Sequence, residues 1–225
     1  MPTISPDRID VGRKLPLEDA VSWAAEHNIG IIDIQLDTGA NVVTSFDQGR
    51  AHAIRRSCDH HDIRLGLHTL SAVNIDAAVL LGAEWIVVHA GFHFSADIPQ
   101  RMQAGLDRLR RVADYADHKS VLLLLENLNN EPPDAEVHYF TNTIEEWRWF
   151  YENLAPLPRV REVRLADCFR NGHEEHLIPG QGDFDLPALF KALEAKGYTG
   201  HYMNAFGSLD DMLNARTLFA GMATD

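Results

Sequence analysis

The stretch Val121-Leu122-Leu123-Leu124-Leu125-Glu126-Asn127 places five apolar residues directly before a carboxylate. Five consecutive apolar side chains without polar alternation are typical of a strand that is buried on both faces, as in a parallel sheet. An ionised carboxylate at the end of such a strand costs free energy unless a metal, a cation or hydrogen bonds compensate it. Glu126 is therefore a candidate site residue. The alternative is a solvated carboxylate just beyond the strand.

Short apolar runs and amphipathic helical stretches alternate on both sides of this segment. We expect seven strands, at residues 8–11, 31–36, 64–69, 85–89, 121–126, 163–166 and 200–203. The helices expected between and after them cover residues 16–27, 46–61, 75–81, 99–117, 143–154, 186–196 and 209–220. This alternation indicates parallel βαβ units and predicts an α/β fold of the (β/α)₈ TIM-barrel class. No linker divides the chain, so we expect a single domain over residues 1–225.

The strand count is one short of the eight that a closed barrel needs. The region of the sixth strand is missing, because a helix ends near Leu154 and the next strand follows a proline-flanked linker around Arg159. A second short connection lies near Asn74, where a strand and a short helix almost meet. Either the barrel is incomplete, or segments are missing from this form of the chain. Whether the two short connections are deletions stays open.

Composition narrows the classes of partner. The chain has 225 residues, 45% of them hydrophobic, and a formal net charge of −13. This charge argues against nucleic acid and anionic membranes, because phosphate backbones bind clustered Lys and Arg. The two cysteines, Cys58 and Cys168, are far apart and suit a reducing compartment. With no signal segment and no apolar run of about 20 residues, we expect a cytoplasmic protein.

Polar side chains cluster where the expected strands end, which is where a parallel barrel carries its catalytic groups. Imidazole and carboxylate groups from separate strand ends could hold Zn, Mn, Mg or Fe. They could equally be hydrogen-bonded structural or substrate-contacting groups. Neither GxxxxGK[ST] nor a strand-following GxGxxG occurs, so no nucleotide cofactor is indicated. The strand-end residues are Gln35, Asp37, His68, His89, Glu126, Arg164, Asp167 and Asn204, and loops add His93, His173, Glu174, Glu175 and His176.

Several of these residues stand in motifs that resemble the xylose-isomerase-like TIM-barrel superfamily, which holds sugar isomerases and epimerases, related dehydratases and endonuclease IV-type enzymes. The resemblance covers roughly residue 29 to the C-terminus. The motifs that carry it are Leu67-His68-Thr69, Val88-His89-Ala90-Gly91, Leu125-Glu126-Asn127, Arg164-Leu-Ala-Asp167, His176-Leu-Ile-Pro-Gly180-Gln-Gly182-Asp-Phe-Asp185 and Gly197-Tyr198-Thr199-Gly200.

The resemblance implies a divalent metal, Mn, Zn or Mg, at a site that is incomplete here. In the isomerase and epimerase branch the metal is held by Glu, Asp, His and Glu on strands five to eight. Glu126 matches the first, the strand-six Asp has no counterpart, Arg164 replaces the His and Asn204 the last Glu. In the endonuclease branch His68, His89 and Glu126 match ligands, and Glu174 with His176 approximates an Asp-x-His pair. The candidate metal ligands taken from both branches are Glu126, His89 and His176.

The resemblance also implies a reaction, namely proton transfer next to a carbonyl group on a small sugar or sugar-derived substrate, as in an isomerase or epimerase. Because Asn204 is not a base, Glu126 has to work alone or with a histidine, and Arg164 supplies positive charge in place of a metal. The expected catalytic residues are Glu126, Arg164 and His89, and the expected substrate-binding residues are His68, Asn127, Asn129, Asp167 and Asn204.

Two alternatives stay open. One is a lyase or dehydratase on the same scaffold, which begins with the same proton abstraction. The other is a catalytically impaired barrel that binds a sugar-like ligand or a protein partner, because its usual ligand set is broken. Endonuclease activity is the least favoured, since the acidic charge opposes it. The oligomeric state is not indicated.

Overall fold

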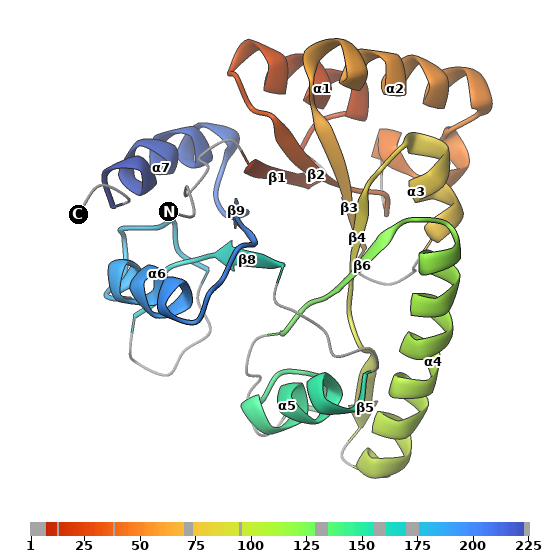
Figure 1. Cartoon of the computed structure of the whole chain (residues 1–225), viewed down its shortest axis with the longest axis vertical. Helices are drawn as coiled ribbons and strands as arrows, with labels where there is room; N and C mark the ends of the chain where they lie inside the picture. The colour runs from red at the N-terminus through yellow and green to blue at the C-terminus, as the bar shows by residue number, and fades with distance from the viewer. Residues whose placement is uncertain are drawn as a thin grey trace.

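The computed structural model describes residues 8–12, 14–37, 39–69, 74–94, 96–128, 135–154, 161–169 and 176–222. Its centre is a curled sheet in which all seven strands run parallel (Figure 1). These strands are β1 (Arg8–Gly12), β2 (Ile31–Gln35), β3 (Arg64–His68), β4 (Trp85–Val88), β6 (Leu122–Leu125), β8 (Glu162–Leu165) and β9 (His201–Asn204). The seven strands expected from the sequence are confirmed.

The order of the strands shows an incomplete barrel. The sheet runs β6-β4-β3-β2-β1-β9-β8, so the first strand pairs with the last, as in a TIM barrel. Within the described residues, the outer edges of β6 and β8 carry no neighbouring strand. The sixth strand of a complete barrel would lie between these two edges. The prediction of an incomplete TIM barrel is confirmed for the described residues, and the single domain over residues 1–225 stays a prediction.

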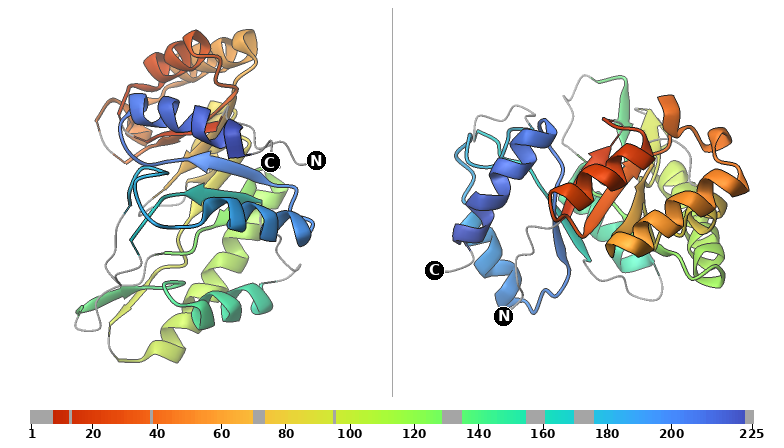
Figure 2. Two further views of the ribbon diagram at one scale, coloured as in Figure 1. Left: turned by 90° about the vertical axis from the view of Figure 1, so that its left-hand side faces the viewer. Right: turned by 90° about the horizontal axis from the view of Figure 1, so that it is seen from above.

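Six of the described helices lie along the outside of the sheet, and α5 lies beside α4 (Figures 1 and 2). Helices α1 to α4 follow one another along β1 to β6, and α6 and α7 pack beside β8 and β9. No described helix has the length and apolar character that crossing a membrane requires. The helices are α1 (Leu17–Glu26), α2 (Gln48–His61), α3 (Ile75–Leu81), α4 (Ile98–His118), α5 (Ile144–Asn153), α6 (Leu186–Ala195) and α7 (Leu209–Met222), with short 3₁₀ turns at Gly39–Asn41 and Val43–Ser45.

Side-chain caps explain where several of these helices begin. Asp47 caps α2 by accepting a hydrogen bond from the Arg50 N–H, and Asn74 caps α3 in the same way. Thr143 caps α5 by accepting a hydrogen bond from the Glu146 N–H. The Glu146 carboxylate, however, accepts from the Thr141 N–H rather than closing a reciprocal box on Thr143.

A two-stranded antiparallel ribbon beside the sheet was not predicted from the sequence. It pairs β5 (Phe92–Phe94) with β7 (Val137–Tyr139), which follow β4 and β6 in the chain. Each strand has three residues, too few to show a period of two, so the sequence carries no usable signal. The ribbon is anchored by His93, which is buried and stacks on Phe140.

Alternating side chains divide the sheet into an outer and an inner face. The outward positions fill an apolar core against the helices, for example Ile9, Ile32 and Ile86. The inner wall has a small apolar group of Ile31, Trp85, Val87, Leu124 and Met203. The inner face differs from an ordinary core in that four carboxylates and one guanidinium also point into it, from Asp10, Asp33, Glu126, Glu162 and Arg164.

At the β6 edge of the described sheet, an inward-facing apolar side chain is exposed. Leu122 and Trp85 are register partners on the same inner face. Trp85 is 2% exposed, whereas Leu122 is 47% exposed. Leu122 faces inward beside a strand position that no described residue occupies, and this accounts for its exposure.

Gly66 on β3 makes room for a buried hydrogen bond on the inner wall. The Trp85 indole N–H donates to Asp33 Oδ1 at 2.8 Å, and a Cβ on Gly66 would lie 2.0 Å from Trp85 Nε1 and 2.2 Å from Asp33 Oδ1. Any side chain at this position therefore separates the pair.

We expect Gly66→Ala to lower the free energy of unfolding by roughly 2–4 kcal/mol, because it overpacks the wall and leaves a buried carboxylate oxygen without its donor. Urea unfolding measures the effect. Gly30→Ala is the matched control, since no atom lies within 4 Å of the added Cβ. Equal unfolding curves for the two variants would contradict this account.

Candidate active site and metal centre

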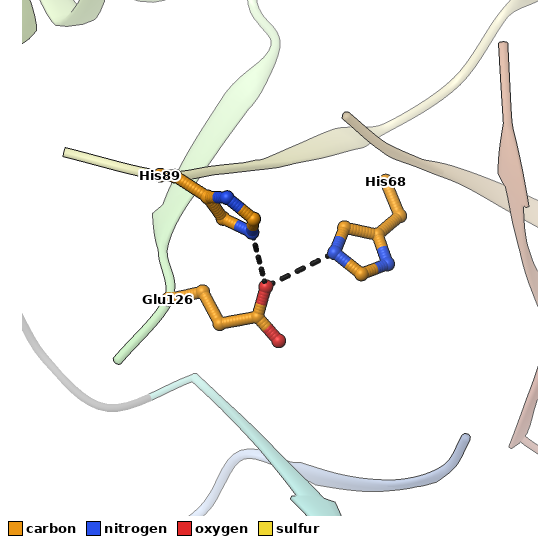
Figure 3. A group of neighbouring side chains, drawn as sticks. All are labelled: His68, His89 and Glu126. Carbon is orange, nitrogen blue, oxygen red and sulfur yellow. Dashed lines mark hydrogen bonds and ion pairs between the residues drawn. The ribbon is translucent and has the colours of Figure 1, made fainter. Parts of the chain in front are cut away.

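Three side chains meet at the carboxyl edge of the sheet. His68 is the last residue of β3, and His89 and Glu126 directly follow β4 and β6. Figure 3 shows both imidazoles converging on one carboxylate oxygen: Glu126 Oε2 lies 3.0 Å from Nε2 of His68 and 3.0 Å from Nε2 of His89. Because parallel strands end at the same edge of a sheet, residues far apart in the chain are brought together here.

The His68 ring is held from both sides. Its Nδ1 lies 3.1 Å from Asp10 Oδ2, and its Nε2 faces Glu126. Burial would lower the pKa of His68, but the hydrogen bonds to Asp10 and Glu126 outweigh it and raise the pKa to about 9. At neutral pH both ring nitrogens therefore carry protons and donate to carboxylates.

A single guanidinium lies beneath this group and contacts four carboxylates. Arg164 on β8 pairs with Asp10 at 2.5 Å, with Asp33, and with Glu162 at 2.9 Å. Its Nε also lies 3.6 Å from Glu126 Oε1. Burial would lower the pKa of Arg164, but the surrounding carboxylates raise it, so the group stays charged.

Negative charge exceeds positive charge in this buried cluster. Four carboxylates face Arg164 and the His68 imidazolium. Burial would raise the pKa of Glu126, yet hydrogen bonds from the two histidines hold it far below its usual range. Burial and the nearby Asp33 charge raise the pKa of Glu162 to about 8, although Arg164 opposes this. Burial also raises the pKa of Asp33, so protonation of Glu162 and Asp33 relieves this excess, and a bound cation would add positive charge beside Glu126.

The donor set suits a divalent metal. One ligand atom from each of His68, His89 and Glu126 lies within 4.8 Å of the other two. Two imidazole nitrogens and a carboxylate oxygen suit Zn or Mn, and three protein ligands leave a position for substrate or water. The Asp10 carboxylate on the far nitrogen of His68 is the usual outer partner of a metal-bound histidine. These three residues therefore fit a divalent metal ion, and both histidines would be neutral when it is bound.

Asn204 points away from this cluster. Its neighbour Met203 lies on the inner wall, so the alternation of β9 sends Asn204 to the outer face. There its Nδ2 donates to the Met212 carbonyl oxygen of α7 at 2.8 Å. The structure places it against a helix, and its role in substrate binding stays a prediction.

Asp167 organises the loop that carries the glycine-rich motif. Its carboxylate accepts hydrogen bonds from four backbone N–H groups, those of Cys168, Gly180, Gly182 and Phe184. A Cβ on Gly182 would lie 2.4 Å from Asp167 Oδ1, so only glycine brings the backbone this close. These bonds indicate a structural task, and substrate binding by Asp167 stays a prediction.

The remaining expected residues lie apart from the three-residue group or outside the described residues. Asn127 is exposed beside Glu126. The His176 ring stacks on Phe206 with centroids 4.6 Å apart, and His176 is not a member of the group that could hold a metal. Its role as a ligand stays a prediction. Asn129, like His173, Glu174 and Glu175, lies outside the described residues.

Sequence reasoning missed Asp10, Asp33 and Glu162. Each is a charged residue within or at the start of a short strand, on the same face as other polar residues two positions away. Asp33 precedes Gln35 by two residues and Glu162 precedes Arg164 by two. Because side chains alternate along a strand, this spacing was the available signal for a charged inner wall.

A family model described as a xylose isomerase-like TIM barrel matches residues 21–161. The chain belongs to this family. The resemblance read from the strand-end motifs is thereby confirmed. A comparison with curated proteins finds no match.

Several solved structures share the fold at low sequence identity. A D-tagatose 3-epimerase-like protein aligns with a TM-score of 0.75 and 17% identity, over 96% of each chain. D-psicose 3-epimerase from Clostridium cellulolyticum H10 aligns with 0.68 and 14%, over 97% of each. A probable 3-DHS dehydratase, AsbF from Bacillus anthracis, aligns with 0.64 and 12%, over 96% of this chain and 97% of its own. At these identities the likeness shows the fold.

Asp167→Asn should lower the free energy of unfolding by roughly 2–4 kcal/mol at pH 7, because the ionised carboxylate accepts four N–H groups. Burial raises the pKa of Asp167, but the backbone bonds lower it overall. Its stabilisation is therefore present above the unfolded pKa of about 3.9 and is lost as the pH falls through the folded value. Urea unfolding at pH 7 and pH 3 should show the wild-type advantage shrinking at pH 3. The exposed Asp114→Asn is the control, and an advantage independent of pH would contradict this.

Metal-free protein should bind one Zn²⁺ or Mn²⁺ per chain. We expect His89→Ala and Glu126→Ala each to weaken binding by at least about 100-fold, because each removes one of three ligands. Isothermal calorimetry and elemental analysis measure the affinity and the stoichiometry. His52→Ala, an exposed histidine on α2, should bind as the wild type does. Equal loss in all variants, or no binding by the wild type, would show that the group is not a metal site.

Proposed function

We propose that the protein is an isomerase- or epimerase-like enzyme that moves a proton at a carbon next to the carbonyl group of a small sugar or sugar-derived substrate. The observation that carries this proposal is the buried Glu126 carboxylate, held between two imidazoles at the carboxyl edge of the sheet. Family membership and the epimerases among the similar folds support it.

In this proposal the two oxygens of Glu126 have different tasks. Oε2 faces His68 and His89, whereas Oε1 takes the substrate proton. His89 contacts the same carboxylate at 3.0 Å and can pass a proton to or from it. A bound divalent metal would polarise the carbonyl oxygen of the substrate as a Lewis acid. Arg164, 3.6 Å from Oε1, adds positive charge beside the enediolate that forms.

The strongly lowered pKa of Glu126 bears on this mechanism. A carboxylate held so firmly in its ionised form is a weak base. Its hydrogen bonds to the two histidines therefore have to weaken when substrate or metal binds. Rearrangement on binding is common at catalytic sites, where hydrogen bonds in the free protein are often not those of the reacting complex.

A lyase or dehydratase is the second candidate. It is supported by the fold shared with a probable 3-DHS dehydratase and by a common first step, the removal of a proton next to a carbonyl. The two candidates differ in the fate of the intermediate: an epimerase returns the proton, whereas a dehydratase expels a hydroxyl group as water. Product analysis by mass separates them.

Exchange of deuterium from D₂O into D-fructose, D-psicose and D-tagatose tests the shared first step. The wild type should label at least one of these sugars at a carbon next to the carbonyl, and Glu126→Gln should lower the rate by at least about 100-fold. Glu84→Gln, an exposed carboxylate paired with Arg64, should not change it.

Labelling that survives in Glu126→Gln would remove Glu126 from the reaction. Binding of a sugar by the wild type without any exchange would instead favour the non-catalytic, ligand-binding alternative.

A further inference from the structure

Asp10 is a buried carboxylate in the middle of the first strand, and it reaches across β2 to a histidine at the end of β3. It is 4% exposed, and its neighbours Ile9 and Val11 are fully buried on the opposite face of the sheet. Its Oδ2 lies 3.1 Å from His68 Nδ1 and 2.5 Å from Arg164 Nη1. Asp10 contacts both groups through the same oxygen, whereas Glu126 uses Oε2 for His68 and lies 3.6 Å from Arg164 Nε through Oε1.

This contact decides which part of the His68 ring faces the site. An imidazole has two nitrogens, and a hydrogen bond on one fixes the orientation of the other. With Nδ1 held by Asp10, Nε2 is directed to Glu126 Oε2 at 3.0 Å. Without Asp10 the ring could rotate about its side-chain torsions or present the other nitrogen.

We propose that Asp10 is a positioning residue, held in place by Arg164, that fixes His68 so that Nε2 faces Glu126. The proposal rests on the proposed function for the catalytic meaning of Glu126. In this proposal Arg164 acts on the site in two ways. It holds Asp10, which orients His68, and it contributes its own positive charge.

Asp33 offers a comparison within the same molecule. It too points to the inner wall, is fully buried and pairs with Arg164. Its other oxygen accepts the Trp85 indole N–H at 2.8 Å, and it has no hydrogen bond to His68. Asp10→Asn and Asp33→Asn therefore each change one carboxylate partner of Arg164, but only the first alters a hydrogen bond to His68.

Zn²⁺ affinity, measured by calorimetry on metal-free protein at one neutral pH, separates the loss of the His68 contact from the change beside Arg164. Asp10→Asn should weaken binding by about 10- to 100-fold, the usual effect of losing an outer carboxylate partner. Asp33→Asn should stay within about threefold of the wild type. Circular dichroism confirms the fold of each variant. If Asp10→Asn does not fold, Asp10→Glu replaces it. The Zn²⁺ affinity of Asp10→Glu should be lower than that of the wild type by less than about tenfold.

Equal weakening in Asp10→Asn and Asp33→Asn would overturn the proposal, since it would reduce Asp10 to a counter-charge of Arg164. An unchanged affinity in Asp10→Asn, or no Zn²⁺ binding by the wild type, would overturn it as well. The titration contains no sugar, so it does not depend on turnover. If no sugar exchanges deuterium but only Asp10→Asn weakens Zn²⁺ binding, the proposed function falls and the role of Asp10 stands.

Discussion

The contact between the Arg164 guanidinium and four buried carboxylates is the constraint on which the inner wall depends. Asp10, Asp33, Glu126 and Glu162 come from different strands or strand ends, and one cation on β8 neutralises part of their charge. Removing one member of such a cluster leaves an uncompensated buried charge, which is strongly destabilising. The cluster also ties β8, one open edge of the sheet, to β1 and β2 across the interior.

This network links the inner wall of a barrel in which no described residue forms the sixth strand. Arg164 places positive charge in the interior below the site. His68, His89 and Glu126 lie above it at the carboxyl edge and keep the nitrogen and oxygen donors that a divalent metal needs.

Much of the fold could be predicted from the sequence, because apolar runs and helical stripes are local signals. The seven strands, the helices between them and the gap in the described sheet between β6 and β8 follow from such signals. The meeting of His68, His89 and Glu126 was also within reach, since parallel strands end at one edge. The three-residue ribbon strands were too short to show a period.

The orientation of individual side chains was harder to predict. Asn204 lies after an inward-facing methionine and turns to α7, which depends on the register of β9. The four N–H donors around Asp167 come from a loop whose path no sequence pattern describes. Asp10 and Asp33 stand between apolar neighbours in the sequence. A charged residue inside an apolar strand indicates a polar inner wall. Reading strand alternation for charged residues would have found them.

The central claim is that buried negative charge at the carboxyl edge makes a cation site of His68, His89 and Glu126. Anomalous X-ray diffraction from crystals grown with Zn²⁺ tests it most directly. The account predicts one strong peak within bonding distance of Nε2 of both histidines and of a Glu126 carboxylate oxygen. A peak bound elsewhere, with the hydrogen bonds between Glu126 and the two histidines intact, would contradict it.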